Sequence, residues 1–150
     1  MPPKVVESSV VRCPHCGRNN RVPKAGAGAP RCGECREPLP WVVDAGDEDF
    51  AEVAEVAEAA RIPVVVDFWA SWCGPCRMVS PALQQVATEL AGRIKLVKVN
   101  IDEAPETSRR FGVQAVPTLV VLRLGQVVAQ RAGAAPAPVL REWVGDALAG

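Results

Sequence analysis

The pattern of hydrophobic and polar positions along the chain changes near residue 41. Upstream of this point, apolar residues are sparse and follow neither a helical nor a strand period, and the segment 17–31 is rich in glycine, proline and asparagine, as loops are. Downstream, apolar runs of strand length alternate with segments whose apolar residues recur at helical spacing. The sequence therefore predicts a small module over 1–40 and an α/β domain over 41–150.

Five strands and four helices are expected in the second part. The run 62–70 is continuously apolar apart from Asp67, as a strand buried on both faces would be. Asp47 or Asp49 is expected to cap the first helix. The expected strands are 41–44, 62–70, 94–102, 118–123 and 126–131, and the expected helices are 45–61, 74–91, 104–111 and 137–149. Their order predicts one mixed sheet, parallel at first and finished by an antiparallel hairpin, with helices on both faces.

Composition and charge narrow the class of protein. Of 150 residues, 49% are hydrophobic and 23% charged, which is typical of a folded globular chain. Seventeen basic and seventeen acidic residues cancel, so no overall attraction to nucleic acid or to anionic lipid is expected. No apolar stretch approaches the ~18 residues that cross a membrane, and the N-terminus lacks the apolar core of a secretory signal. We therefore expect a cytoplasmic protein, whose cysteines serve as metal ligands or redox catalysts.

Two pairs of cysteines in the first part have the spacing of a zinc ribbon. The pattern is CxxC, fifteen residues, CxxC, formed by Cys13, Cys16, Cys32 and Cys35. Each CxxC turn directs two thiolates to one point, and four thiolates form the tetrahedron that Zn²⁺ prefers. Residues 1–40 carry seven basic and three acidic residues, a charge of +4, which we interpret as compensation for the thiolates. An iron site and two structural disulfides are the alternatives, and His15 is expected to face solvent rather than bind the metal.

The third pair, Cys73 and Cys76, has no further ligands nearby and follows a buried strand at the start of a helix. Unpaired backbone N–H groups and the helix dipole stabilise a thiolate at that position, so Cys73 is predicted to be a nucleophile and Cys76 the thiol that resolves the mixed disulfide. Gly74 allows the backbone of a partner to approach, and Pro75 stiffens the first turn.

Asp67 is the only charged residue within its apolar strand. Burial would raise the pKa of its carboxyl group, which suits a proton acceptor for Cys76. The alternative is a surface aspartate on an edge strand. Lys98, on the next expected strand, is a candidate partner for Asp67, although solvent exposure is the default for a lysine in a strand.

Four stretches give the chain a resemblance to the thioredoxin family over residues 41–149. They are "VVVDFWASWCGPCRMVSP", "VKVNID", "FGVQAVPTLVVL" and "GQVVAQRAGA", similar in order and spacing to that family. Together with the upstream cysteines, the whole chain resembles the zinc-binding thioredoxin-2 type. The resemblance implies a thioredoxin fold, a central mixed sheet flanked by helices, preceded by a small zinc ribbon.

The resemblance also implies roles for individual residues. Cys73 and Cys76 would be the redox dithiol, and Asp67 the buried acid. Trp69 would support the site from within, and Pro117 would be a cis proline facing the dithiol. The substrate-docking surface would comprise Trp72, Gly74, Pro75, Val116, Pro117 and Gly133.

The predicted function is reduction of disulfides in protein substrates, with Cys73 and Cys76 recycled by an NADPH-dependent thioredoxin reductase. We expect a monomer that binds one structural Zn²⁺ and no organic cofactor, nucleic acid or membrane. One alternative is a zinc-ribbon module that binds protein or nucleic acid and uses the second domain as a scaffold. Another is an oxidase or isomerase, but the Gly74-Pro75 dipeptide and the missing secretory signal favour reduction.

Overall fold

The computed structural model describes residues 8–25, 28–56 and 61–149. Its main sheet has five strands in the order β3-β5-β4-β6-β7, in which β3, β5 and β4 are parallel and β6 and β7 are antiparallel to their neighbours. The strands are β3 (Val42–Asp44), β4 (Val64–Trp69), β5 (Lys95–Asn100), β6 (Thr118–Arg123) and β7 (Gln126–Ala132). The expected mixed sheet with a closing hairpin is confirmed.

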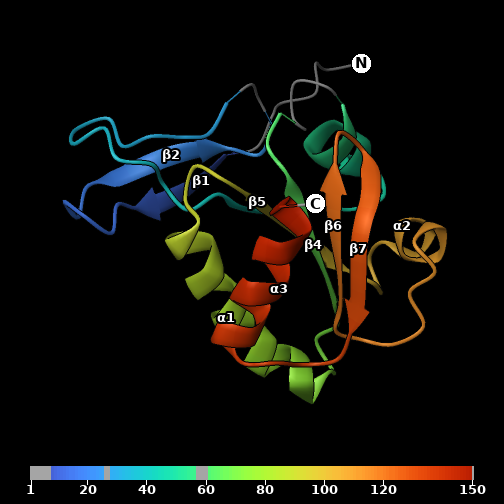
Figure 1. Ribbon diagram of the computed structural model, residues 1–150. Helices are drawn as coiled ribbons and strands as arrows, with labels where there is room; N and C mark the ends of the chain where they lie inside the picture. The colour runs from blue at the N-terminus through green and yellow to red at the C-terminus, as the bar shows by residue number, and fades with distance from the viewer. Residues whose placement is uncertain (1–7, 26–27, 57–60, 150) are drawn as a thin grey trace, which may run out of the picture.

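Helices cover both faces of this sheet (Figure 1). Helices α1 (Gly74–Glu89) and α3 (Ala137–Ala149) pack against the face that carries Val65, Leu96 and Leu119. The opposite face carries Val64, Val66 and Phe68 and packs against η1 (Ala51–Glu55) and the segment around α2 (Pro105–Arg110). Because β4 lies at the centre, its residues are buried by helices on both sides and by neighbouring strands at both edges, which explains its nearly continuous apolar run.

The first expected helix is much shorter than predicted. Only Ala51–Glu55 is helical, as a single π-turn, and Val56 is already extended, while residues 57–60 lie outside the described part. The carbonyl of Val53, within this turn, accepts a hydrogen bond from Lys95 Nζ at 2.6 Å.

The expected capping of this helix by Asp47 or Asp49 was wrong. Asp47 accepts hydrogen bonds from the backbone N–H groups of Glu106 and Thr107, at 3.2 and 2.8 Å, and therefore caps α2. Asp49 instead accepts a hydrogen bond from the N–H of Gly46 at 2.8 Å. Neither side chain caps η1, whose first residue follows Phe50 without a side-chain cap.

The N-terminal segment forms a hairpin of β1 (Ser8–Arg12) and β2 (Asn19–Pro23), followed by a loop that holds the second cysteine pair. Its buried side chains Val22 and Leu39 belong to the same hydrophobic cluster as Trp41 and Val43 of the main domain. The segment thus shares the core of the larger domain, a contact that the sequence did not predict.

Two polar contacts reinforce this attachment. The indole N–H of Trp41 donates to the carbonyl of Pro23 at 2.9 Å. Lys95, which is 0% exposed, donates to the carbonyl of Lys24, and its ammonium lies 4.2 Å from the centre of the Trp41 ring. No helix in the described residues is long and apolar enough to cross a membrane.

Candidate functional site

Cys73 and Cys76 form a disulfide at the N-terminus of α1. Strand β4 ends at Trp69, and a short turn leads to Gly74, where the helix begins. Cys73 is the N-cap residue, and its Sγ accepts a hydrogen bond from the backbone N–H of Cys76 at 3.1 Å. This bond and the positive end of the helix dipole favour negative charge on Cys73 when the disulfide is reduced.

Exposure does not distinguish the two cysteines, because each is 3% exposed. Their difference lies in the helix position: only Cys73 has its sulfur directed at a free helix N–H group. A side chain at Gly74 would meet no atom within 4 Å, so the space above the first turn is open. The first turn of the helix, beside the disulfide, is therefore open to an approaching partner at Gly74.

The loop before β6 lies against the disulfide. The carbonyl oxygen of Val116 is 3.6 Å from Cys73 Sγ, and the Val116–Pro117 peptide bond is cis, as the family resemblance implied. Gly133 lies beside this loop, since its N–H donates to the carbonyl of Pro117 at 2.9 Å. Three expected docking positions, Val116, Pro117 and Gly133, are therefore adjacent to one another, and Val116 contacts Cys73.

Asp67 lies on the central strand β4 and is only 1% exposed, which excludes a surface aspartate on an edge strand. Its carboxylate oxygens have no hydrogen-bond partner among the described residues. Burial raises the pKa of the Asp67 carboxyl group to about 6, while the positive charge of Lys98 acts in the opposite direction. Because side chains alternate along a strand, Asp67 shares the face of Val65, the face that α1 covers.

Lys98 is the register partner of Asp67 on β5. It is half-buried, and its ammonium lies 5.3 Å from the centre of the Trp69 ring. Asp67 and Lys98, both predicted from the sequence to belong to the site, are therefore register neighbours on two parallel strands, and Trp69 lies beside Lys98.

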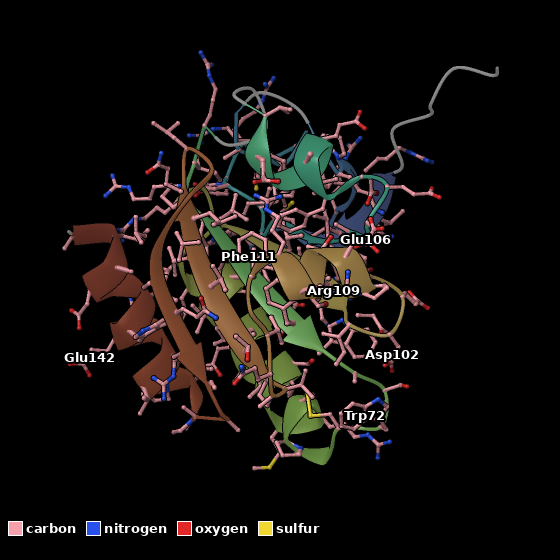
Figure 2. All side chains as sticks on the ribbon, turned by 90° about the vertical axis from the view of Figure 1, so that its right-hand side faces the viewer. Trp72, Asp102, Glu106, Arg109, Phe111 and Glu142 are labelled. Carbon is pink, nitrogen blue, oxygen red and sulfur yellow. A yellow bond between two sulfur atoms is a disulfide. The ribbon has the colours of Figure 1, made fainter. Side chains whose placement is uncertain are left out.

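Trp72 is exposed over 66% of its surface next to the disulfide, and its indole N–H donates to Asp102 Oδ2 at 2.9 Å. Figure 2 shows Trp72 and Asp102 at the end of the molecule where the disulfide lies. Asp102 was not predicted from the sequence as a residue of this site. The available signal was its position two residues after the end of β5, because the carboxyl ends of the parallel strands β4 and β5 meet at one edge of the sheet.

The sulfur atoms of the four N-terminal cysteines lie within 4.8 Å of one another. The turns that carry them repeat the same hydrogen bonds. In the first, the N–H of Cys13 donates to the carbonyl of Arg18 and the N–H of Gly17 to the carbonyl of Cys13. The second turn, which begins at Cys32, has the same pair of bonds. The residue after each pair is left-handed, with φ of +79° at Gly17 and +68° at Arg36.

This donor set fits a tetrahedral metal ion. The first sulfur of each pair accepts a backbone hydrogen bond. The N–H of His15 donates to Cys13 Sγ and the N–H of Glu34 donates to Cys32 Sγ, both at 3.4 Å. Hydrogen bonds from the backbone, chiefly from Cys35, lower the pKa of the Cys32 thiol to about 6, and hydrogen bonds from Cys16 and His15 lower that of Cys13. The pKa values of Cys16 and Cys35 are raised instead, despite hydrogen bonds from the backbone of Arg18 and Glu37, because burial and the neighbouring cysteine side chains disfavour further negative charge. A dication such as Zn²⁺ would offset the repulsion among four thiolates held this close together.

His15 is exposed and takes part through its backbone N–H, so four sulfur atoms are the candidate ligands in the described part. The cysteine cluster and the disulfide lie at opposite ends of the molecule: Figure 2 shows the N-terminal strands at one end and the disulfide near Trp72 at the other. The three CxxC pairs therefore form two separate sites.

In a comparison with known protein families, residues 42–146 match the family model described as thioredoxin. Thioredoxin from Haemophilus influenzae is 43% identical over 103 residues, which cover 69% of this chain and 94% of that protein. Thioredoxin from Bacillus subtilis is 41% identical over 107 residues, covering 71% and 98%. The chloroplastic thioredoxin M4 of Arabidopsis thaliana is 33% identical over 141 residues, covering 94% of this chain and 72% of its own length.

Proposed function

The chain belongs to the thioredoxin family and is a protein-disulfide oxidoreductase, and we propose that Cys73 and Cys76 carry the reaction by reducing disulfides in other proteins. The observation that carries the proposal is the disulfide at the N-terminus of α1, beside the carbonyl of Val116. It joins two cysteines at a position that stabilises a thiolate and that a partner can approach.

In the first step, the Cys73 thiolate attacks one sulfur of the target disulfide. The target S–S bond breaks, its other sulfur leaves as a thiolate, and Cys73 becomes linked to the target in a mixed disulfide. The N–H of Cys76, which lies 3.1 Å from Cys73 Sγ in the oxidised form, stabilises the attacking charge.

In the second step, the Cys76 thiol transfers its proton to the Asp67 carboxylate and attacks Cys73 Sγ. The mixed disulfide breaks, the target leaves with its second sulfur as a thiolate, and the Cys73–Cys76 disulfide forms. Two electrons have then passed to the target. A carboxyl group with a pKa of about 6 suits this proton transfer near neutral pH, and the neighbouring Lys98 limits how far burial raises that pKa.

Substrate docking is proposed along the loop that ends in the cis proline. An extended segment of the target would pair with the backbone of Val116, while Trp72 and the open space at Gly74 would accommodate the chain around the scissile disulfide. Pro75, Pro117 and Gly133 would shape this surface through their backbone conformation.

We further propose that the cycle closes by reduction of the Cys73–Cys76 disulfide by an NADPH-dependent thioredoxin reductase in the cytoplasm, with the protein acting as a monomer. The four N-terminal cysteines would hold one structural Zn²⁺, whose contribution is to join the two turns of a ribbon that has no core of its own. No step of the redox reaction requires the metal.

The test is reduction of insulin in the presence of NADPH and thioredoxin reductase. Cys73→Ser is expected to abolish turnover, whereas Cys76→Ser should form a stable mixed disulfide with the target, since Cys73 can attack but nothing resolves the product. Ser71→Ala, an exposed neighbour, serves as the control and should keep full turnover. Turnover by Cys73→Ser would contradict the assignment.

A further inference from the structure

Asn20 bridges the two cysteine turns. It lies on β2 between the first pair, which ends at Cys16, and the second pair, which begins at Cys32. Its Nδ2 donates to the carbonyl of Arg18 at 3.0 Å and to Cys32 Sγ at 3.6 Å, and its Oδ1 accepts a hydrogen bond from the backbone N–H of Gly33 at 3.0 Å.

These contacts determine which way the amide points. With the oxygen and nitrogen exchanged, the oxygen would face the Arg18 carbonyl and the Cys32 sulfur, and the NH₂ group would face the N–H of Gly33. All three contacts would then be repulsive. The observed orientation satisfies both N–H groups and the oxygen of the amide, so the side chain is held rigidly against Cys32.

Both turns are connected to this one side chain. The carbonyl of Arg18 that receives Nδ2 also accepts the N–H of Cys13, which closes the first turn, while Gly33 is the residue after Cys32 in the second. Apart from the sulfur atoms themselves, Arg18 and Glu34 also link the turns, through an exposed ion pair of 3.1 Å, and such pairs contribute little.

The bond to Cys32 makes the cluster asymmetric. Both Cys13 and Cys32 receive a backbone N–H from the residue two positions on, but in the described part only Cys32 also receives a side-chain N–H. A donated N–H withdraws charge from a thiolate and fixes its direction, and groups that orient a ligand in this way affect metal affinity strongly.

We infer that Asn20 is a positioning residue of the metal site, which orients Cys32 as a ligand and fixes the distance between the two cysteine turns. The inference rests on the proposed Zn²⁺ site. It assigns to a neutral amide the role of stabilising the Cys32 thiolate, in a site where four thiolates and one dication would sum to a charge of −2.

The experiment compares two identical changes at adjacent positions, Asn20→Asp and Asn19→Asp, in the full chain. Asn19 is exposed and precedes Asn20 on the same strand, so the control adds the same charge at nearly the same place. Asn20→Asp places a carboxylate oxygen against the Arg18 carbonyl and the Cys32 thiolate while keeping the acceptor for Gly33.

We expect competition with a chelator to show a 10- to 100-fold loss of Zn²⁺ affinity for Asn20→Asp, a figure typical of changes next to metal ligands, and less than about a twofold change for Asn19→Asp. In Co²⁺-loaded protein, the sulfur-to-metal charge-transfer band should shift for Asn20→Asp and for Asn20→Ala, which lacks the N–H without adding charge. Insulin reduction at saturating Zn²⁺ reports whether the catalytic domain of each variant is folded, and the intensity of the Co²⁺ band reports whether the ribbon still assembles around the metal.

Equal Zn²⁺ affinities for the two Asp variants, or an unshifted Co²⁺ band in Asn20→Ala, would overturn the role of Asn20 but leave the proposed metal site standing. Failure of the unchanged protein to bind Zn²⁺ would overturn the proposed metal site and this inference with it. The two failures are distinguishable, because the first leaves tight binding by the unchanged protein intact.

Discussion

The indole N–H of Trp72 donates a 2.9 Å hydrogen bond to the carboxylate of Asp102, so the exposed ring beside the disulfide is held from the end of the neighbouring strand. Asp102 itself is fixed, because its backbone N–H donates to Asn100 Oδ1 at 2.9 Å. A large apolar side chain that is 66% exposed would otherwise adopt several rotamers.

We predict that Asp102→Ala weakens docking of protein substrates. Loss of a hydrogen bond of roughly 0.5–1.5 kcal/mol corresponds to a KM for insulin that rises by about two- to tenfold, with kcat little changed. Glu103→Ala removes an exposed charge from the next position and is the matched control. The same rise in KM for both variants would show that charge, rather than the position of Trp72, is responsible.

We predict that Asp67→Asn stabilises the protein at neutral pH. The pKa of Asp67 is raised from 3.8 to about 6, so the folded state binds more protons than the unfolded state between these values and stability falls as pH rises through this window. Removing the charge should add about 3 kcal/mol to the free energy of unfolding at pH 7 and nothing below pH 3.

Urea unfolding of the oxidised protein at several pH values measures this difference, with the exposed Asp146→Asn as control. The same substitution should slow release of the target from the mixed disulfide, because Cys76 loses its proton acceptor. A variant that is no more stable than the parent at pH 7 would contradict the burial argument.

Lys95 should make stability depend on pH in the alkaline range. Burial lowers the pKa of its ammonium from 10.5 to about 8, so between these values the unfolded state binds more protons than the folded state. The free energy of unfolding is therefore expected to rise between pH 8 and pH 10 relative to that of Lys95→Met, in which this dependence is absent.

Lys98→Met is the control for Lys95, since Lys98 lies on the same strand but is half-buried. It should keep the alkaline rise. Lys95→Met also removes the hydrogen bonds that Lys95 donates to the carbonyls of Lys24 and Val53, which tie the N-terminal segment to the main domain, so increased proteolysis within residues 8–40 is expected. Parallel stability curves for the parent and Lys95→Met would contradict the prediction.

Asp47→Ala should destabilise α2, because it removes the acceptor for two N–H groups and for the Thr107 hydroxyl, which lies 2.7 Å from Oδ1. Loss of an N-cap typically lowers the Tm of a domain of this size by about 4 °C. Hydrogen bonds from Thr107 lower the pKa of Asp47, so its contribution is present above about pH 4 and disappears as pH falls below that.

Thermal unfolding of Asp47→Ala, Thr107→Val and the double variant measures the coupling of the two side chains. We expect the two losses of Tm to be less than additive, because both variants remove the same hydrogen bond. Strict additivity would indicate that Asp47 acts elsewhere.

Much of the chain could be predicted from local patterns. The strands of the main sheet and the helices after residue 73 follow from periodicity, which each segment carries within itself. Both cysteine arrangements follow from CxxC spacing, because a tight turn brings two thiols together over four residues. Asp67 was recognisable as a polar residue in a strand with both faces buried. The prediction of the first helix was wrong in its extent: the apolar period continues along 50–57, but Val56 is already extended, and periodicity does not say where a helix stops.

The sequence by itself therefore specified the element order, the two cysteine sites and the buried acid, since their causes lie within a few residues. The contacts that the fold alone decides join residues far apart in the chain: Trp72 with Asp102 across 30 positions, Asp47 with Thr107 across 60, and Lys95 with Lys24 across 71. No local pattern encodes such partners, because each is chosen by how the strands align in the sheet and by where the ribbon packs against it.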